Sequence, residues 1–92
     1  MKYRFHEGIV YTKVSNVHLL IATRSAWDQF PSIKQISALH GVFCKGIDMG
    51  MTDEEVINAI ILPRKMTREK VRDSYYSFVK KMSEEGYLIP GE

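Results

Sequence analysis

The chain has 92 residues, of which 45% are hydrophobic and 26% charged, and its net charge is +2. A chain of this length predicts one domain, covering residues 1–92. The composition excludes a disordered chain, and so small a net charge indicates neither a nucleic-acid nor a membrane binder. The single cysteine, Cys44, excludes an intramolecular disulfide and fits a reducing compartment. No apolar run reaches the roughly 20 residues that span a bilayer, so we expect a cytoplasmic protein.

The first third of the chain predicts strands. GIVYTKV and VHLLIA are rich in β-branched and aromatic residues, and Ser15 and Asn16 between them suit a tight turn. The next segment, RSAWDQF, is interpreted as a short third strand that contains the only tryptophan, Trp27. Pro31 would end this strand, because proline cannot donate to a sheet ladder.

The rest of the chain predicts three helices. Apolar stripes mark the first helix at Ile33, Ile36, His40, Phe43 and Ile47, and the third at Val71, Tyr75, Phe78 and Met82. The second helix begins at Thr52 with Glu55 three residues later, a capping box, and is expected to stop at Pro63. Thr67 is interpreted as the cap of the third helix and Gly86 as its C-terminal cap. The tail YLIPGE is interpreted as too short for another element.

No group of residues indicates catalysis. His40 and Cys44 are four residues apart and would share a helix face, as half of a zinc site does, but two ligands do not make a site. We interpret both as partly buried core residues, since free cysteine commonly behaves as a small hydrophobe. No glycine-rich phosphate loop is present. We therefore expect no enzyme activity, no cofactor and no metal.

Basic residues gather around the third predicted helix, which has seven of the 13 in the chain. They are Arg64, Lys65, Arg68, Lys70, Arg72, Lys80 and Lys81. Two interpretations stay open: a solvated face with interspersed acidic partners, or a strip that attracts an anionic partner. Tyr76 and Val79 lie beside the apolar stripe, where they would either widen the core contact or line a groove.

Two segments resemble the PqqD-type peptide chaperones, also called RiPP recognition elements. GMTDEEVINAI is similar to the glycine, threonine and acidic start of that family's second helix, and REKVRDSYYSFVKKMSEEGYLI to its amphipathic last helix. GIVYTKVSNVHLLIA matches as a hairpin pattern. The resemblance covers most of the chain. Together with the element order it implies a winged-helix-like α+β fold, in which a small N-terminal antiparallel sheet of two to three strands precedes a three-helix bundle.

Members of this family bind the leader of a ribosomally made precursor peptide and present it to a modifying enzyme. The resemblance implies that the leader adds as a strand to the edge of the third strand and packs against the third helix, which is β-augmentation. At the strand edge, it assigns peptide binding to Arg24, Ser25, Ala26, Trp27, Asp28 and Gln29. On the helix, it assigns peptide binding to Arg68, Arg72, Tyr75, Tyr76 and Val79. AWDQFPSI departs from the family, which has an aliphatic residue and an asparagine at this point.

The resemblance thus predicts a standalone peptide-binding adaptor. Its expected partners are the leader of a precursor peptide and a separate modifying enzyme, such as a radical SAM enzyme, a protease or a cyclase. A winged-helix DNA-binding regulator is the alternative, and a small subunit that completes another protein's sheet is a third hypothesis. The low net charge and the short YLIPGE segment, which leaves no room for a wing hairpin, speak against DNA. We expect no membrane partner, and an exposed sheet edge also allows a homodimer.

Overall fold

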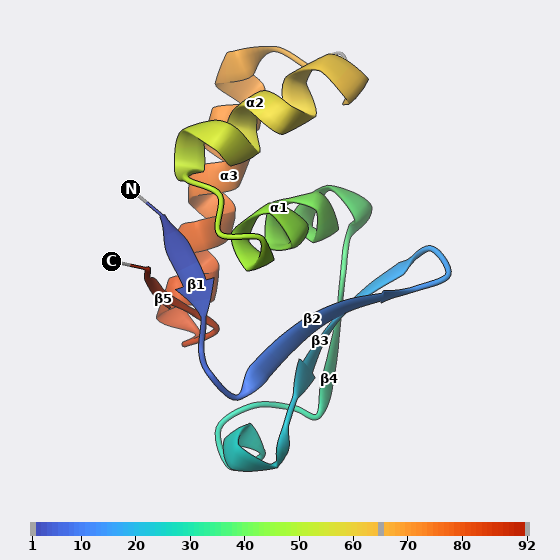
Figure 1. Ribbon diagram of the computed structural model, residues 1–92, viewed down its shortest axis with the longest axis vertical. Helices are drawn as coiled ribbons and strands as arrows, with labels where there is room; N and C mark the ends of the chain where they lie inside the picture. Colours follow the sequence, from blue (N-terminus) through green and yellow to red (C-terminus); the bar gives the residue numbers. More distant parts are fainter. Residues whose placement is uncertain (1, 65, 92) are drawn as a thin grey trace.

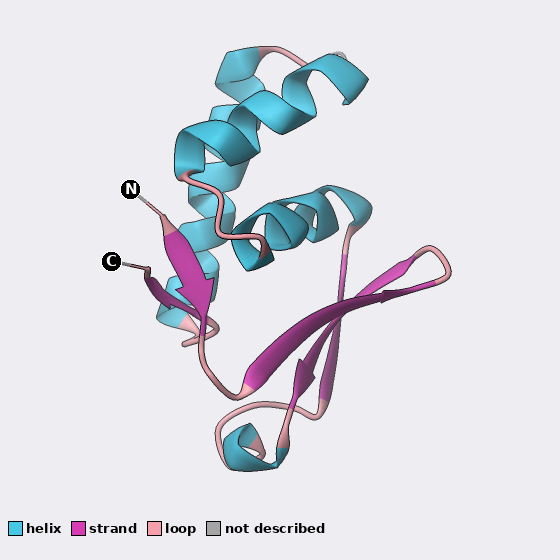
Figure 2. Cartoon of the chain, viewed as in Figure 1, coloured by secondary structure: helices cyan, strands magenta, loops and turns pink. Residues whose placement is uncertain are grey.

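The computed structural model describes residues 2–64 and 66–91 and confirms the predicted α+β class. A three-stranded sheet and the α2–α3 pair lie on either side of α1 (Figures 1 and 2). The elements in chain order are β1 (Tyr3–Phe5), β2 (Ile9–Val14), β3 (Val17–Ala22), the 3-10 helix η1 (Arg24–Ala26), β4 (Ile33–Ile36), α1 (Ala38–Asp48), α2 (Asp53–Arg64), α3 (Arg68–Glu84) and β5 (Leu88–Pro90). In the described part of the chain, no helix has the length and apolarity that a membrane span requires.

The main sheet is antiparallel and has the strand order β2-β3-β4. The predicted hairpin is confirmed: Val14 pairs with Val17 across a two-residue turn, and Ser15 has a left-handed φ of 55°. β4 pairs with β3 from His18↔Ile36 to Ile21↔Ile33. β4 is therefore an edge strand of this sheet.

The two ends of the chain form a second, two-stranded sheet. β1 pairs antiparallel with β5, with Arg4 opposite Ile89. The prediction that YLIPGE forms no element was therefore wrong. Each strand has only three residues, and its partner comes from the opposite end of the sequence, so no local sequence pattern predicts that the two strands pair. Gly86, with a φ of 89°, turns the chain from α3 toward β5, as predicted for a C-terminal cap.

The segment RSAWDQF is not a strand, which corrects the sequence prediction. Residues 24–26 form η1, and the backbone N–H of Phe30 donates to the carbonyl of Ala26 at 3.0 Å. The indole Nε1 of Trp27 donates to the carbonyl of Ala22 at 2.9 Å, while the guanidinium of Arg24 lies 5.8 Å from the indole centroid. These contacts hold the segment as a compact turn, and β4 takes the place of the predicted third strand.

The first helix begins later than its apolar stripe predicted, because Ile33 and Ile36 lie in β4. Ser37 is the N-cap, and its Oγ accepts a hydrogen bond from the N–H of His40 at 3.2 Å. A spacing of three residues is shared by a helical stripe and by the two ends of a four-residue strand, so the two isoleucines were misassigned.

The predicted starts of α2 and α3 are confirmed. The N–H of Thr52 donates to Oε1 of Glu55 at 2.9 Å, and the N–H of Glu55 donates to Oγ1 of Thr52 at 3.3 Å, which completes the capping box. Thr67 caps α3 through the N–H of Lys70. The predicted end of α2 was one residue short, since the helix runs past Pro63 to Arg64.

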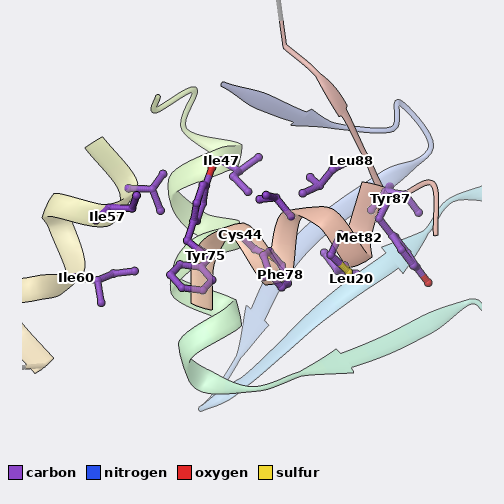
Figure 3. Packing of buried hydrophobic residues seen from close by; sticks show 14 of the residues in the cluster. Leu20, Cys44, Ile47, Ile57, Ile60, Tyr75, Phe78, Met82, Tyr87 and Leu88 are labelled. Atoms are coloured by element: carbon purple, nitrogen blue, oxygen red, sulfur yellow. The ribbon is translucent and has the colours of Figure 1, made fainter. Parts of the chain in front are cut away.

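The core lies between α1, α3 and the inner face of the main sheet (Figure 3). The predicted stripe of α3 is buried, and the Phe43 ring of α1 meets those of Tyr75 and Phe78 with centroids 5.3 and 5.6 Å apart. The hydroxyl of Tyr75 donates to Oδ1 of Asp53, itself buried, at 2.6 Å. This packing fixes α3 relative to α1, and β4 leads directly into α1.

Candidate functional site

The open edge of β4 is the first part of the candidate site. β4 has β3 on one side and no strand of the described chain on the other. The N–H of Ala22 donates to the carbonyl of Ser32 at 2.9 Å, so this pair belongs to the hydrogen-bonded set of the ladder. Partners alternate along an antiparallel ladder, and the main-chain groups of Lys34 and Ile36 therefore point to β3. Those of Ile33 and Gln35 point to the open edge.

Beside this edge lies a groove with a volume of about 560 Å³. One wall is β4 with the start of α1, and the other wall is one face of α3. The groove is lined by Lys34, Gln35, Ile36, Ser37, His40, Asp73, Ser74, Ser77, Phe78, Lys81 and Met82. An unpaired strand edge and a helix face thus border the same hollow.

The floor of the groove is apolar. Phe78 and Met82 are only 4% and 2% exposed, and the half-buried Ile36 lies beside them on the β4 side. The imidazole of His40 packs on Phe78 with ring centroids 4.6 Å apart. Burial, and secondarily the charge of Lys81, lower the pKa of His40, which favours the neutral ring. The floor therefore suits an apolar side chain.

Charged side chains stand along the rim. Lys34 Nζ lies 3.5 Å from Oε1 of Glu85 and 5.6 Å from the ring centroid of Tyr87, which joins the start of β4 to the end of α3. Lys81 lines the groove toward that end, and Asp73 lies two helical turns earlier. The rim is therefore basic toward the C-terminal end of α3 and acidic toward its N-terminal end.

The strand-edge residues assigned from the sequence lie outside this groove. Ala26 is fully buried, whereas Trp27 is 56% exposed and points its indole N–H at Ala22. Arg24, Ser25, Asp28 and Gln29 are exposed on η1 and the turn after it. No residue of 24–29 lines the groove. That a peptide binds this segment stays a prediction, but the segment has no strand edge to offer.

The helix residues assigned from the sequence lie on other faces of α3. Tyr75 and Val79 are buried in the core, and Tyr76 is 42% exposed away from the groove. The guanidinium of Arg68 is bound to α2 through Asn58 and Glu54. Arg72 is exposed and does not line the groove. The groove side of α3 runs instead through residues 73, 74, 77, 78, 81 and 82. Peptide contacts of the five assigned helix residues stay untested.

The sequence contained a signal for the residues that were missed. Ser37 is a good N-cap, so an N-terminus of the helix at Ser37 would have separated IKQI from α1 as a strand. The groove face of α3 has no such signal, because Ser74, Ser77 and Lys81 look like an ordinary solvated face. Their position opposite β4 follows only from the packing.

Cys44 and His40 behave as expected for residues of the core and its border. Cys44 is fully buried, and burial together with Asp48 raises the pKa of its thiol. Among the described residues, no group of three or more side chains of the metal-ligating types comes together. His18, on β3, is also buried, and its Nδ1 lies 2.7 Å from the hydroxyl of Tyr11.

Two solved structures share this architecture. One is TbiB1 in complex with the TbiA(beta) leader peptide, with a TM-score of 0.77 over 92% of this chain and 93% of that chain. The other is a lasso peptide synthetase B1 complexed with the leader peptide, with a TM-score of 0.78 over 98% and 100% of the two chains. This chain has the fold of lasso peptide synthetase B1.

The sequence identity to each is 14%, so the likeness to the B1 proteins is one of fold. It confirms the fold that the sequence resemblance predicted. No family model and no curated protein sequence matches the chain.

Proposed function

We propose that the chain is a peptide-binding adaptor that captures the leader of a ribosomally made precursor peptide by strand addition and presents it to a separate modifying enzyme. The observation that carries the proposal is the open edge of β4 beside a groove walled by α3. In β-augmentation, main-chain hydrogen bonds provide affinity and pockets for alternate side chains provide specificity. The open edge of β4 supplies the main-chain hydrogen bonds, and the groove supplies the pockets for side chains.

The proposal places the docking edge at β4 rather than at residues 24–29. A guest strand would pair with the outward main-chain groups of Ile33 and Gln35. Its alternate side chains would then enter the groove over Phe78. Support also comes from the two structural neighbours, both of which were solved with a leader peptide.

The role we propose is binding, and the chemistry belongs to the partner enzyme. A radical SAM enzyme, a protease or a cyclase would fit, and the cytoplasm is the proposed setting for this reaction. The open β4 edge can also pair with a second copy of the chain, because unpaired edges are templates for strand addition. In that case, a leader and a second copy would compete for the same edge.

Proline at position 35 tests strand addition directly. Gln35→Pro removes an N–H that points to the open edge and leaves the bonds between β3 and β4 in place. We expect the affinity for the leader of a precursor peptide encoded beside this gene to fall about tenfold or more, because one main-chain bond is lost and the ring blocks the edge. Gln35→Ala is the matched control and should bind as the wild type does.

Affinity is measured by fluorescence anisotropy of the labelled leader, and the contact surface by backbone amide shifts in NMR. The largest shifts are expected at Ile33 and Gln35. Equal binding by Gln35→Pro and the wild type would contradict strand addition at β4. Tight duplex DNA binding that weakens steeply with salt, with unchanged β4 amides, would favour the regulator hypothesis instead.

A further inference from the structure

The groove has side chains of opposite charge toward its two ends. Asp73 and Lys81 line it from the same helix, eight residues apart. The ion pairs among the described residues are Lys34–Glu85 and Arg68–Glu54, so neither Asp73 nor Lys81 is neutralised by such a pair. Both are exposed and available to a guest. A peptide in this groove would therefore meet a carboxylate at one end and an ammonium group at the other.

The spacing of these two charges matches the repeat of an extended strand. Eight residues of helix rise about 12 Å, and four residues of a strand span about 13 Å. Alternate side chains of a strand point to the same face, so residues i, i+2 and i+4 of a guest all face α3. Residue i+2 then lies over the apolar floor formed by Phe78, Met82 and Ile36.

The direction of the guest follows from the directions of its two walls. Lys34, in the first half of β4, meets Glu85 after the end of α3, while His40, beyond β4, packs on Phe78 one to two turns earlier in α3. β4 and α3 therefore run in opposite directions, as Figure 1 shows. A guest antiparallel to β4 runs parallel to α3, and it passes Asp73 before Lys81. Antiparallel pairing is also the more stable kind per residue and continues the pattern of this sheet.

From this geometry we infer that the groove selects an extended peptide with a basic residue at i, an apolar residue at i+2 and an acidic residue at i+4. The basic side chain lies beside Asp73, the apolar one over Phe78 and the acidic one beside Lys81. The inference rests on the proposed function, because it assumes strand addition at β4. It adds the side-chain chemistry and the direction of the guest.

The test uses two capped nine-residue peptides of equal composition. One has arginine at its third position, leucine at its fifth and glutamate at its seventh, with threonine elsewhere; the other has the arginine and glutamate exchanged. We expect the first to bind about tenfold more tightly in fluorescence anisotropy. Each exposed charge contact is worth about twofold, and the exchange turns two attractive contacts into two repulsive ones. The preference should shrink as salt is raised.

The double variant Asp73→Lys with Lys81→Asp reverses the groove at constant net charge. It should prefer the second peptide by a similar factor. Lys45→Asp with Asp48→Lys is the matched control, because it makes the same exchange on exposed residues of α1 that do not line the groove. The control should keep the wild-type preference.

Three outcomes would overturn the inference: equal affinities of the wild type for both peptides, a wild-type preference for the second peptide, or an unchanged preference in the reversed variant. Failure of the first peptide to bind the wild type at about 1 mM would overturn it as well. The proposed function is judged separately, by whether Gln35→Pro weakens binding of the precursor leader. Leader binding that depends on Gln35 but not on Asp73 and Lys81 would leave strand addition standing and remove only the charge pattern.

Discussion

Replacing Gly41 with alanine is expected to destabilise the fold, although glycine is normally the weaker helix former. Gly41 lies in the first turn of α1, where the helix meets β3. A methyl group there would come within 2.0 Å of Nδ1 and 2.1 Å of Cγ of His18. The imidazole is buried, and its Nδ1 lies 2.7 Å from the hydroxyl of Tyr11, so it cannot simply rotate into solvent. Either the ring or the helix has to move.

The change in the free energy of unfolding is the sum of two costs and one gain. Overpacking of a well-packed core costs about 1–3 kcal/mol, and loss of the bond between Tyr11 and His18 adds about 1 kcal/mol. The higher helix propensity of alanine offsets about 1 kcal/mol of this destabilisation. Gly41→Ala should therefore lower the free energy of unfolding by about 2 kcal/mol. In a His18→Ala background the clash is gone, and the same substitution should stabilise the protein by up to about 1 kcal/mol.

Urea denaturation followed by circular dichroism measures both effects. The wild type, the two single variants and the double variant form a thermodynamic cycle, and the sign of the Gly41→Ala effect should reverse between the two backgrounds. A stabilising Gly41→Ala in the wild-type background would refute the reasoning, because the close approach of α1 to β3 would then cost nothing. Binding of the proposed leader peptide is a second measurement, since α1 places His40 at the groove.

Two further predictions concern a buried hydroxyl and a titrating ring. Tyr75→Phe leaves the buried carboxylate of Asp53 without its 2.6 Å donor, and should cost about 1–3 kcal/mol in urea denaturation, whereas Tyr76→Phe should cost little. The pKa of His40 is lowered in the folded state, so the unfolded chain binds this proton more readily, and stability should fall as pH drops below about 6.5. His40→Gln should lose less stability between about pH 7 and 5 than the wild type, and an equal loss in both would contradict this assignment.

Local signals in the sequence predicted much of the helical part correctly. The capping box at Thr52, the cap at Thr67 and the glycine after α3 each depend on a few neighbouring residues, and all three are confirmed. The buried stripe of α3 follows from helical periodicity and is also confirmed. The hairpin turn at Ser15 also depends on neighbouring residues only, and it is confirmed as well.

The errors have two causes, an unrecognised local turn in RSAWDQF and, at the candidate site, long-range packing. Tryptophan and phenylalanine favour a strand in RSAWDQF, but the bond from Trp27 to Ala22 and the turn at Ala26 hold it as η1. The face of α3 at the candidate site was assigned from the family resemblance, and Arg68 is engaged by α2 instead. A helix has several polar faces, and only the position of β4 singles out the one with Ser77 and Lys81.

The pairing of β1 with β5 brings the two ends of the described chain together. The N–H of Gly91 donates to the carbonyl of Lys2 at 2.9 Å. Chains with adjacent ends tolerate circular permutation. A short linker across this junction, with new ends opened at Ser15 in the exposed hairpin turn, should therefore keep the fold. The same geometry suits insertion of the whole unit into a loop of another protein, which would attach the proposed peptide-binding domain to an unrelated enzyme.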